Sequence, residues 1–261
     1  MGRSALHPRR ARRDAGVVAP VAKSSSRRVR SAGTATAAAT AQRLIASLGG
    51  RYSQELGIRL EPDDAAVDEW FLASTLFGTR ISAELAMRTY RELARAGVRT
   101  VADTRTRTWD ELVALLDAGG YARYDFRTAT RLQQLAGDVH DRLAGTVTTL
   151  AVVDDPRRLE SELDRFPGWG PTTVRIFLRE LRGVWPGAQP AIDDRTARAA
   201  RHLGLTLPRG HAAQIDALHA IAARAHVDVR DLESGLVRLA LTHRDQRGCK
   251  GGAACRALEP T

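Results

Sequence analysis

The amino-acid sequence predicts an all-α protein, and three observations support this fold class. Apolar residues recur three and four positions apart along most of the 261 residues. No segment shows the sustained alternation of apolar and polar residues that a half-buried strand produces. Residues that start and stop helices frame several of these apolar segments. No run of eighteen apolar residues occurs, so no membrane span is expected.

The expected helices follow one another closely along the chain. In chain order they cover 37–56, a segment from 63 through 72, 81–97, a segment opening at 108–111, a segment around 132–143, one helix on each side of 166–170, and then 193–203, 211–226 and 229–243. Gly97 is suited to end the third of these helices. The "TWDE" stretch at 108–111 is a capping-box pattern. Leu132, Leu135 and Val139 share one face of the helix that follows.

Basic residues concentrate at the start of the chain. Residues 1–40 hold nine Lys and Arg and one acid, Asp14, which accounts for +8 of the net charge of +10. This segment is rich in Ser, Ala and Gly, so we expect a disordered basic tail before a helical domain at 41–261. Such a tail either binds polyanions without sequence preference or is a solvated extension with no partner, and the composition allows both.

The stretch "FPGWGPTTVRIFLREL" (166–181) places a Pro-Gly-x-Gly turn between two helices. Gly168 and Gly170 permit positive φ and leave no side chain between the backbone and a ligand. Pro171 suits a first helical turn, where its missing N–H costs nothing. The free N–H groups at that helix start would form an anion site. A tight connection between two packed helices explains the same residues, so the turn alone leaves both interpretations open.

The stretch "AIDDRTARAARHLGL" (191–205) places two acids at another helix start. An Asp in this position stabilises a helix as its N-cap and through the helix dipole. Because a helix has one N-cap, Asp193 and Asp194 provide one capping carboxylate and one spare. Capping alone does not explain both residues.

Taken in this order, the two motifs resemble the endonuclease III-like DNA glycosylase superfamily. "FPGWGPTTVRIFL" is similar to its helix-hairpin-helix element "LPGVGxxTAxxxL", and "IDDRTARAARHLGL" to "VDTHVxRVxxRLGL", which carries the family's catalytic aspartate. Asp193 keeps the spacing of five residues to Arg198 and ten to Leu203, whereas Asp194 keeps neither. "GGYARYDFRTATRLQQLA" is loosely similar to the family's "GxYxxKAxxI". The resemblance covers roughly residues 41–248.

This resemblance implies a two-lobed helical fold with a helix-hairpin-helix motif and a central cleft. A six-helix barrel lobe would cover about 61–184, and a second lobe would combine 41–60 with 185–248. Residues 249–261 would form a degenerate C-terminal loop.

The resemblance also implies a base-excision repair glycosylase that acts on double-stranded DNA as a monomer, in the cytoplasm and associated with the nucleoid through DNA. Such an enzyme flips a damaged or mismatched base out of the duplex and hydrolyses its N-glycosidic bond. Asp193 would be the catalytic residue that stabilises the oxocarbenium-like sugar and activates water. The expected DNA contacts are Pro167, Gly168, Trp169, Gly170, Thr172, Thr173 and Arg198.

The chain departs from the family at the position of its lysine nucleophile. Bifunctional members carry a Lys two residues after the second hairpin Gly, and here that residue is Thr172. The two lysines of the chain, Lys23 and Lys250, lie far from the motif in sequence. Arg is not a usable amine nucleophile, which Schiff-base chemistry requires. We therefore expect a monofunctional, hydrolytic glycosylase without AP-lyase activity.

The C-terminal iron–sulfur loop of many family members is also incomplete. Such a cluster needs four thiolates, and this chain has only Cys249 and Cys255. We expect no cofactor and no metal, with free thiols favoured over a zinc site built from both cysteines, His243 and a fourth ligand. Two cysteines also exclude a disulfide framework and fit a reducing compartment.

Aromatic residues provide candidates for stacking on a flipped base. The family's "SAQ" stretch reads "LFGTR" at 76–80, so its Gln is missing. Phe77, Tyr121 and Tyr124 are candidates for a base pocket, while Trp70 and Phe71 are expected in the core. Trp169, at the tip of the turn, either wedges toward a groove or staples the two helices. Arg175 and Arg179 either contact phosphates or lie on a solvated helix face, which is the usual position of surface arginines.

Two other hypotheses remain open. A catalytically silent helix-hairpin-helix DNA-binding protein would keep the turn and would explain the missing Gln, Lys and cysteines. A helical protein-interaction domain with a basic tail would explain the helices but not the two motifs in order. Asp193, in phase with the family pattern, favours the enzyme.

Overall fold

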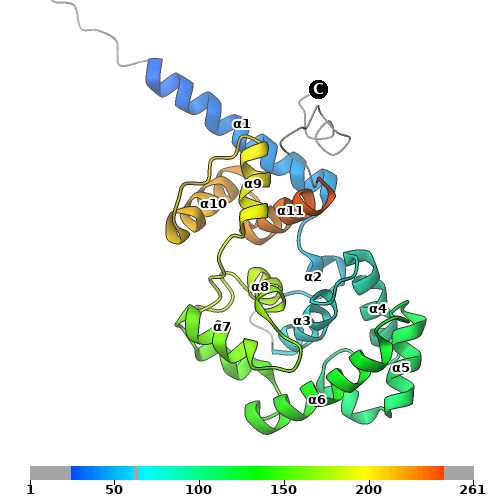
Figure 1. Cartoon of the computed structure of the whole chain (residues 1–261). Coiled ribbons are helices and arrows are strands. Elements are labelled where there is room, and N and C mark those ends of the chain that lie inside the picture. The colour runs from blue at the N-terminus through cyan, green and yellow to red at the C-terminus, as the bar shows by residue number, and fades with distance from the viewer. Residues whose placement is uncertain (1–24, 62–63, 244–261) are drawn as a thin grey trace, which may run out of the picture.

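The computed structural model describes residues 25–61 and 64–243 and confirms the all-α fold class. Within these residues the chain forms α-helices, two short 3-10 helices and no β-strand (Figure 1). None of these helices is long and apolar enough to cross a bilayer. The α-helices are α1 (Ser25–Leu48), α2 (Tyr52–Glu55), α3 (Asp64–Phe77), α4 (Ala83–Arg95), α5 (Trp109–Ala118), α6 (Asp125–Leu143), α7 (Pro156–Asp164), α8 (Pro171–Glu180), α9 (Asp194–His202), α10 (His211–Ala225) and α11 (Val229–Thr242); the 3-10 helices are η1 (Ala102–Thr106) and η2 (Val147–Val152).

The first helix differs from its expected span of 37–56. It runs from Ser25 to Leu48, and a separate short helix begins at Tyr52. Gly49 has φ +86°, a conformation that ends a helix and favours glycine. Residues 25–40 therefore belong to a helix rather than to the expected tail, and the expected disorder of residues 1–24 lies outside the described residues.

Local signals place most of the other helix ends. Thr108 accepts a hydrogen bond from the Glu111 N–H, and the Glu111 carboxylate accepts one from the Thr108 N–H, which confirms the capping box of α5. Gly97, with φ +81°, follows the last turn of α4. The last three helices lie within two residues of their expected ends. These agreements arise because caps and helix periodicity depend only on neighbours along the chain.

Buried side chains form two hydrophobic clusters. The large cluster fills the space among α3 to α8 and contains Trp70, Phe71 and Phe177, which confirms the expected core positions of Trp70 and Phe71. The small cluster joins α1 to α9, α10 and α11, which gather in the upper part of Figure 1. Tyr52 and Leu60 also pack in the large cluster.

A buried ion pair fixes α8 to α11. Arg182 follows α8, and its Nε donates to the Glu233 carboxylate at 2.9 Å; neither side chain is more than 3% exposed. The other guanidinium nitrogens donate to the Gln189 side chain and to the Pro190 carbonyl. A buried charge is tolerated when its hydrogen bonds are satisfied, as they are here. Because α11 also packs on α9, this pair helps to set the position of α8 relative to α9.

Candidate functional site

The turn between α7 and α8 has the backbone geometry that its glycines allow. Gly168 adopts φ +76°, whereas Gly170 is extended with φ −151° and is the N-cap of α8. Pro171 occupies the first position of α8, as expected. Leu159 and Leu163 on α7 are fully buried, so α7 is anchored in the large cluster immediately before the turn.

The start of α8 carries unpaired backbone donors. No side chain caps this helix, and among the described residues no acceptor bonds the N–H groups of Gly170, Thr172 or Thr173. These N–H groups carry the partial positive charge of the helix dipole. An oxyanion placed beside this turn would satisfy them.

The indole of Trp169 turns inward, away from solvent. The residue is 6% exposed, and its ring stacks on Phe71 with centroids 4.3 Å apart. Its Nε1 donates to the Thr75 Oγ1 at 3.1 Å. Trp169 therefore staples the turn to α3, and the alternative of a wedge toward a groove is wrong. Thr173 is also buried, so neither of these two side chains is exposed as the expected DNA contacts would require.

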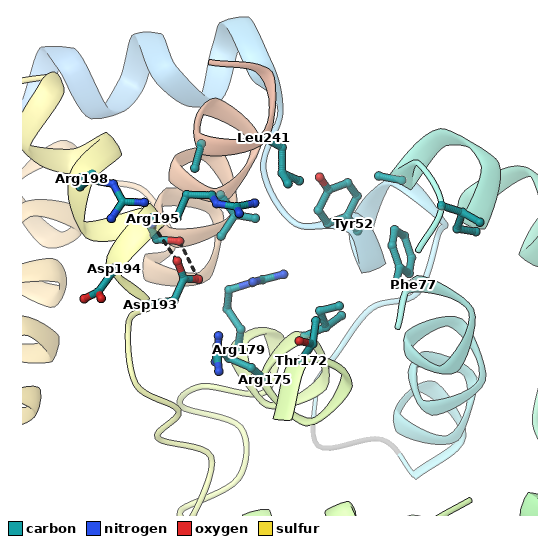
Figure 2. Close-up of a pocket in the computed structure, with 16 residues that line it drawn as sticks. Tyr52, Phe77, Thr172, Arg175, Arg179, Asp193, Asp194, Arg195, Arg198 and Leu241 are labelled. Atoms are coloured by element: carbon teal, nitrogen blue, oxygen red, sulfur yellow. Dashed lines mark hydrogen bonds between the residues drawn. The ribbon is translucent and has the colours of Figure 1, made fainter. Parts of the chain in front are cut away.

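A pocket of about 600 Å³ opens beside the turn and is lined from α2, α3, α8, α9 and α11 (Figure 2). It brings together residues that the sequence analysis selected independently: Phe77, Thr172, Asp193 and Arg198. Thr172 and Asp193 come from the two separate motifs. The pocket is therefore the place where the turn motif and the acidic motif meet.

The side chain of Asp193 is held in one orientation at the N-terminus of α9. It is the N-cap of the helix, and its Oδ1 accepts the Thr196 N–H at 2.9 Å. Its Oδ2 accepts the Thr196 hydroxyl at 3.0 Å. Asp193 is half-buried, whereas Asp194 is exposed in the first turn of α9. The capping carboxylate and the carboxylate selected by the motif spacing are thus the same residue.

Arginines form the charged wall of the pocket. Arg175 and Arg179 come from α8, and Arg195 and Arg198 from α9. Among the described residues none of the four has a hydrogen-bond or salt-bridge partner. Arg195 and Arg198 are exposed and Arg175 is half-buried. Arg179 is only 5% exposed, so the expected solvated position is wrong for this residue.

The position of Arg179 in the sequence allowed its burial but did not predict it. Arg175 and Arg179 are four residues apart and flank the apolar stripe of α8, which includes Val174 and Leu178. Residues at the edge of a helix's apolar face, such as Arg179, become buried only where another element covers that edge. That covering cannot be read from α8 alone.

Two aromatic rings form the opposite wall of the pocket. The ring centroids of Tyr52 and Phe77 lie 5.1 Å apart, and the Arg238 guanidinium lies 3.8 Å from the Tyr52 ring centroid. Burial raises the pKa of the Tyr52 hydroxyl, so this group stays protonated and neutral at pH 7. The sequence analysis missed Tyr52 because it was expected within one continuous first helix.

The buried carboxylate of Glu180 holds the α2 start in place. It accepts the N–H groups of Tyr52 and Ser53, each at 2.9 Å. Complete burial raises the pKa of Glu180, while these hydrogen bonds act in the opposite direction. Because Glu180 ends α8, the helix that follows the turn also positions the aromatic wall.

The other two base-pocket candidates lie elsewhere. Tyr121 is buried in the large cluster, and its hydroxyl donates to the Leu76 carbonyl at 2.7 Å. Tyr124 is half-buried with its ring 6.3 Å from that of Tyr121, and it does not line the pocket. Of the three candidates only Phe77 lines the pocket, since the other two pack with α6 and the core beneath it.

A second, smaller pocket of about 360 Å³ lies at the tip of the turn. It is lined by Pro167 and Gly168 together with Arg127, Arg131 and other residues of α6. Partial burial, and then the nearby Arg127, lower the pKa of Arg131. A Cβ atom at Gly168 would collide with the Arg131 guanidinium, so glycine permits this close approach. The sequence analysis missed both arginines because they precede the turn by a whole helix.

The metal prediction concerns residues outside this site. Among the described residues no group of three or more His, Cys, Asp or Glu side chains could hold a metal ion. Cys249, Cys255 and Lys250 lie beyond the described residues, so the expectation of free thiols stays a prediction. Comparison of the chain with protein-family models, with curated proteins and with solved structures finds no match.

Proposed function

We propose that the protein is a monofunctional DNA glycosylase in which Asp193 assists hydrolysis of an N-glycosidic bond. The observation that carries this proposal is that Asp193 and Thr172 line one pocket, although they come from two separate motifs. The carboxylate thereby lines the same pocket as Thr172, one of the residues whose unpaired N–H groups would hold a DNA phosphate. The large and small clusters would be the two lobes, and this pocket the cleft between them.

DNA would be held on both sides of the turn. The N–H groups at the α8 start would bind one backbone phosphate, and Arg131 beside Gly168 would bind a neighbouring one. Arg195 and Arg198 are exposed at the rim of the larger pocket, where they would contact the strand that enters it. Such contacts position the duplex and carry no sequence information.

Asp193 would act on the sugar of an everted nucleotide. The bond between C1′ and the base nitrogen breaks, and the base leaves with the bonding electrons and takes up a proton from solvent. A water molecule adds its hydroxyl to C1′ and loses its proton to the carboxylate. Because Thr196 fixes both carboxylate oxygens, the negative charge is already oriented toward the developing cation, which is where preorganisation lowers a barrier.

Strand cleavage through a Schiff base is not part of the proposal. Thr172 occupies the position at which bifunctional members of the endonuclease III-like superfamily, which the motifs resemble, carry lysine. A hydroxyl cannot form an imine. The described residues contain no lysine at all, since Lys23 and Lys250 lie outside them.

A second candidate function is a catalytically silent DNA-binding protein. The observation that favours it is that both oxygens of Asp193 serve a structural role as the α9 cap. In that case the acid would be retained for helix stability alone. Both functions predict DNA binding, but only the glycosylase predicts formation of an abasic site.

A panel of duplexes tests the two candidates. Each duplex carries one lesion or mismatch and is treated with alkali after incubation with wild-type protein or with Asp193→Asn. The glycosylase predicts alkali-labile abasic sites that are lost in Asp193→Asn, while the thermal stability and DNA affinity of the variant stay near wild type because Asn also caps helices. Binding without product across the panel supports the silent protein, and strand scission without alkali contradicts the monofunctional chemistry.

The same binding assay tests the protein-interaction alternative. A variant that lacks residues 1–24 removes six of the nine basic residues of segment 1–40 and keeps the helical part of the chain. If the helical part binds DNA, its affinity should remain and should fall with rising salt. Complete loss of DNA binding in this variant would leave the tail as the DNA contact and would contradict the role of the turn.

A further inference from the structure

Arg179 is a buried cation with no hydrogen-bond or salt-bridge partner among the described residues. The residue is 5% exposed, its Nε has no hydrogen-bond partner, and its side chain lines the larger pocket (Figure 2). Burying a charged group without a hydrogen-bonded partner lowers the stability of a fold. A guanidinium that serves only the fold would be expected to have its donors satisfied.

Arg182 shows how a structural arginine looks in the same segment of chain. It is buried to a similar extent, yet its guanidinium bonds the Glu233 carboxylate, the Gln189 side chain and the Pro190 carbonyl. The contrast between Arg182 and Arg179 indicates that the donors of Arg179 are kept for a group that enters the pocket.

The acids near Arg179 are engaged elsewhere. Asp193 directs both oxygens to Thr196, and Glu180 directs its carboxylate to the N–H groups at the α2 start. Neither forms a salt bridge with Arg179 within the described part of the chain. Burial raises the pKa of Glu180 and the charge of Arg179 acts to lower it, but among the described residues no acceptor bonds the Arg179 guanidinium.

Arg179 is more buried than the other arginines that line the pocket. Arg195 and Arg198 are exposed at the rim, where a phosphate of a DNA strand would stay in contact with solvent. Arg179 lies between Asp193 on one side and Tyr52 on the other in the close-up view of Figure 2. A nucleotide whose sugar meets Asp193 would extend its base toward the aromatic wall and so present an edge to Arg179.

Resting on the proposed function, we propose that Arg179 determines base specificity by selecting a base that presents an exocyclic carbonyl oxygen at the edge it meets. A guanidinium has only donors, so it accepts C=O and ring-nitrogen acceptors and rejects an exocyclic amino group. The substrate class is then the oxo bases, of which deaminated bases are the sharpest case. Tyr52 and Phe77 provide the stacking surface for the ring.

Two comparisons between target bases test this inference, and in each the two bases differ in one exocyclic group. Hypoxanthine differs from adenine, and uracil from cytosine, by an exocyclic oxygen in place of an amino group. We would measure equilibrium binding to duplexes that carry each base on a non-hydrolysable 2′-fluoro sugar, and single-turnover product formation on the natural sugars. Wild type should prefer the oxo base of each pair by roughly 5- to 150-fold, the discrimination expected of one good bidentate arginine contact.

Three variants assign that preference to a residue. Arg179→Gln should abolish the preference, and Arg179→Lys should keep the charge but lose part of the preference, since ammonium lacks the planar fork. Arg175→Gln, one helical turn earlier, should weaken binding of all four duplexes equally. Because Arg179 has no hydrogen-bond or salt-bridge partner in the described part of the chain, Arg179→Gln should not lower the thermal stability, whereas a structural role would lower it.

The two readouts separate failure of this inference from failure of the proposed function. Absence of product with a preserved oxo preference in binding contradicts the glycosylase and leaves the assignment of Arg179 intact. Equal affinity of wild type for the oxo and amino bases overturns the assignment even if product forms. Equal weakening of all duplexes in Arg179→Gln, with a smaller salt dependence, would make Arg179 a phosphate contact and would also overturn it.

Discussion

Thr196 holds both carboxylate oxygens of Asp193, one through its backbone N–H at 2.9 Å and the other through its hydroxyl at 3.0 Å. The two contacts fix the torsion of the carboxylate as well as its position. The helix cap and the acid of the pocket are therefore one group. Asp193→Asn keeps a capping side chain and removes the charge, whereas a change in Thr196 keeps the charge and tests how the carboxylate is oriented.

Thr196→Val should lower the rate of base removal without unfolding the protein. Valine keeps the shape and the backbone N–H but removes the hydroxyl that orients Oδ2 of Asp193. We expect a rate loss of about tenfold and a stability loss of about 1 kcal/mol, the typical contribution of one hydrogen bond. Single-turnover kinetics and urea unfolding measure the two effects. Thr196→Ser, which restores the hydroxyl, should recover the rate, and a rate unchanged in Thr196→Val would show that Oδ2 needs no orientation.

The two glycines of the turn should respond differently to alanine. Gly168→Ala should destabilise the fold by about 1–2 kcal/mol, because φ +76° disfavours a side chain and the new Cβ would displace Arg131. Gly170→Ala should stay within about 0.5 kcal/mol of wild type, since Gly170 is extended and no atom lies within 4 Å of the added Cβ. Urea unfolding measures both values.

DNA affinity then distinguishes a binding turn from a packing turn. If a phosphate lies against the α8 start, the Cβ of Gly170→Ala would come between the phosphate and the backbone donors. We expect roughly tenfold weaker DNA binding, since a hydrogen bond to a charged group contributes about 1.5–3 kcal/mol. Unchanged affinity in Gly170→Ala would favour a connection that serves only helix packing.

Trp169→Ala should lower the free energy of unfolding by about 3–5 kcal/mol, the usual cost of deleting a buried aromatic side chain. Trp169→Phe keeps the stacking on Phe71 and loses only the hydrogen bond to Thr75, so its cost should be about 1 kcal/mol. DNA affinity measured by fluorescence anisotropy should be the same for Trp169→Phe and wild type. Loss of affinity in that folded variant would restore a direct DNA contact for Trp169.

Arg131→Gln should weaken DNA binding in a salt-dependent manner. The residue lies at the turn beside Arg127, and no described acid pairs with either arginine. Removing one phosphate contact should reduce the slope of log K against log salt by about 1. Arg95→Gln is a matched control, since Arg95 is exposed on α4 and pairs with Glu92. Equal salt slopes for Arg131→Gln and Arg95→Gln would contradict a contact at the turn.

Asp228→Asn should destabilise the protein at neutral pH but not at low pH. Asp228 caps α11 and pairs with Arg230 at 2.6 Å and with Arg51 at 3.3 Å. Burial acts to raise the pKa of Asp228, but the hydrogen bonds from Arg230 outweigh it and hold that pKa below its ordinary value of 3.8.

The direction of this pKa shift sets the pH window. A lowered pKa in the folded state means that the ionised carboxylate stabilises the fold above pH 3.8, and that this contribution is lost as pH falls through the lower folded-state value. We expect Asp228→Asn to cost about 1–3 kcal/mol at pH 7. Urea unfolding at pH 7, 5 and 3 should show the difference between wild type and variant shrinking only at the lowest pH. A constant difference over this range would assign the effect to geometry rather than charge.

Sequence reasoning recovered the site only in part, as α8 and α9 illustrate. It selected Asp193 and Thr172 from motif spacing, and the pocket brings both together. It placed Trp169 at the surface as one alternative and Tyr121 in a base pocket, and both are buried. It did not identify Tyr52 or Arg131, which reach their positions from other helices.

The sequence by itself determined the all-α class, the cap at Thr108, the buried stripe of α8 and the N-terminal position of Asp193. These follow from hydrogen bonds and periodicity that extend over a few neighbouring residues. Only the tertiary structure decided that Arg182 forms a salt bridge with Glu233 while Arg179 forms none among the described residues. The partner of a side chain at the edge of a buried face depends on which distant helix covers it, and that information lies in packing rather than in local sequence.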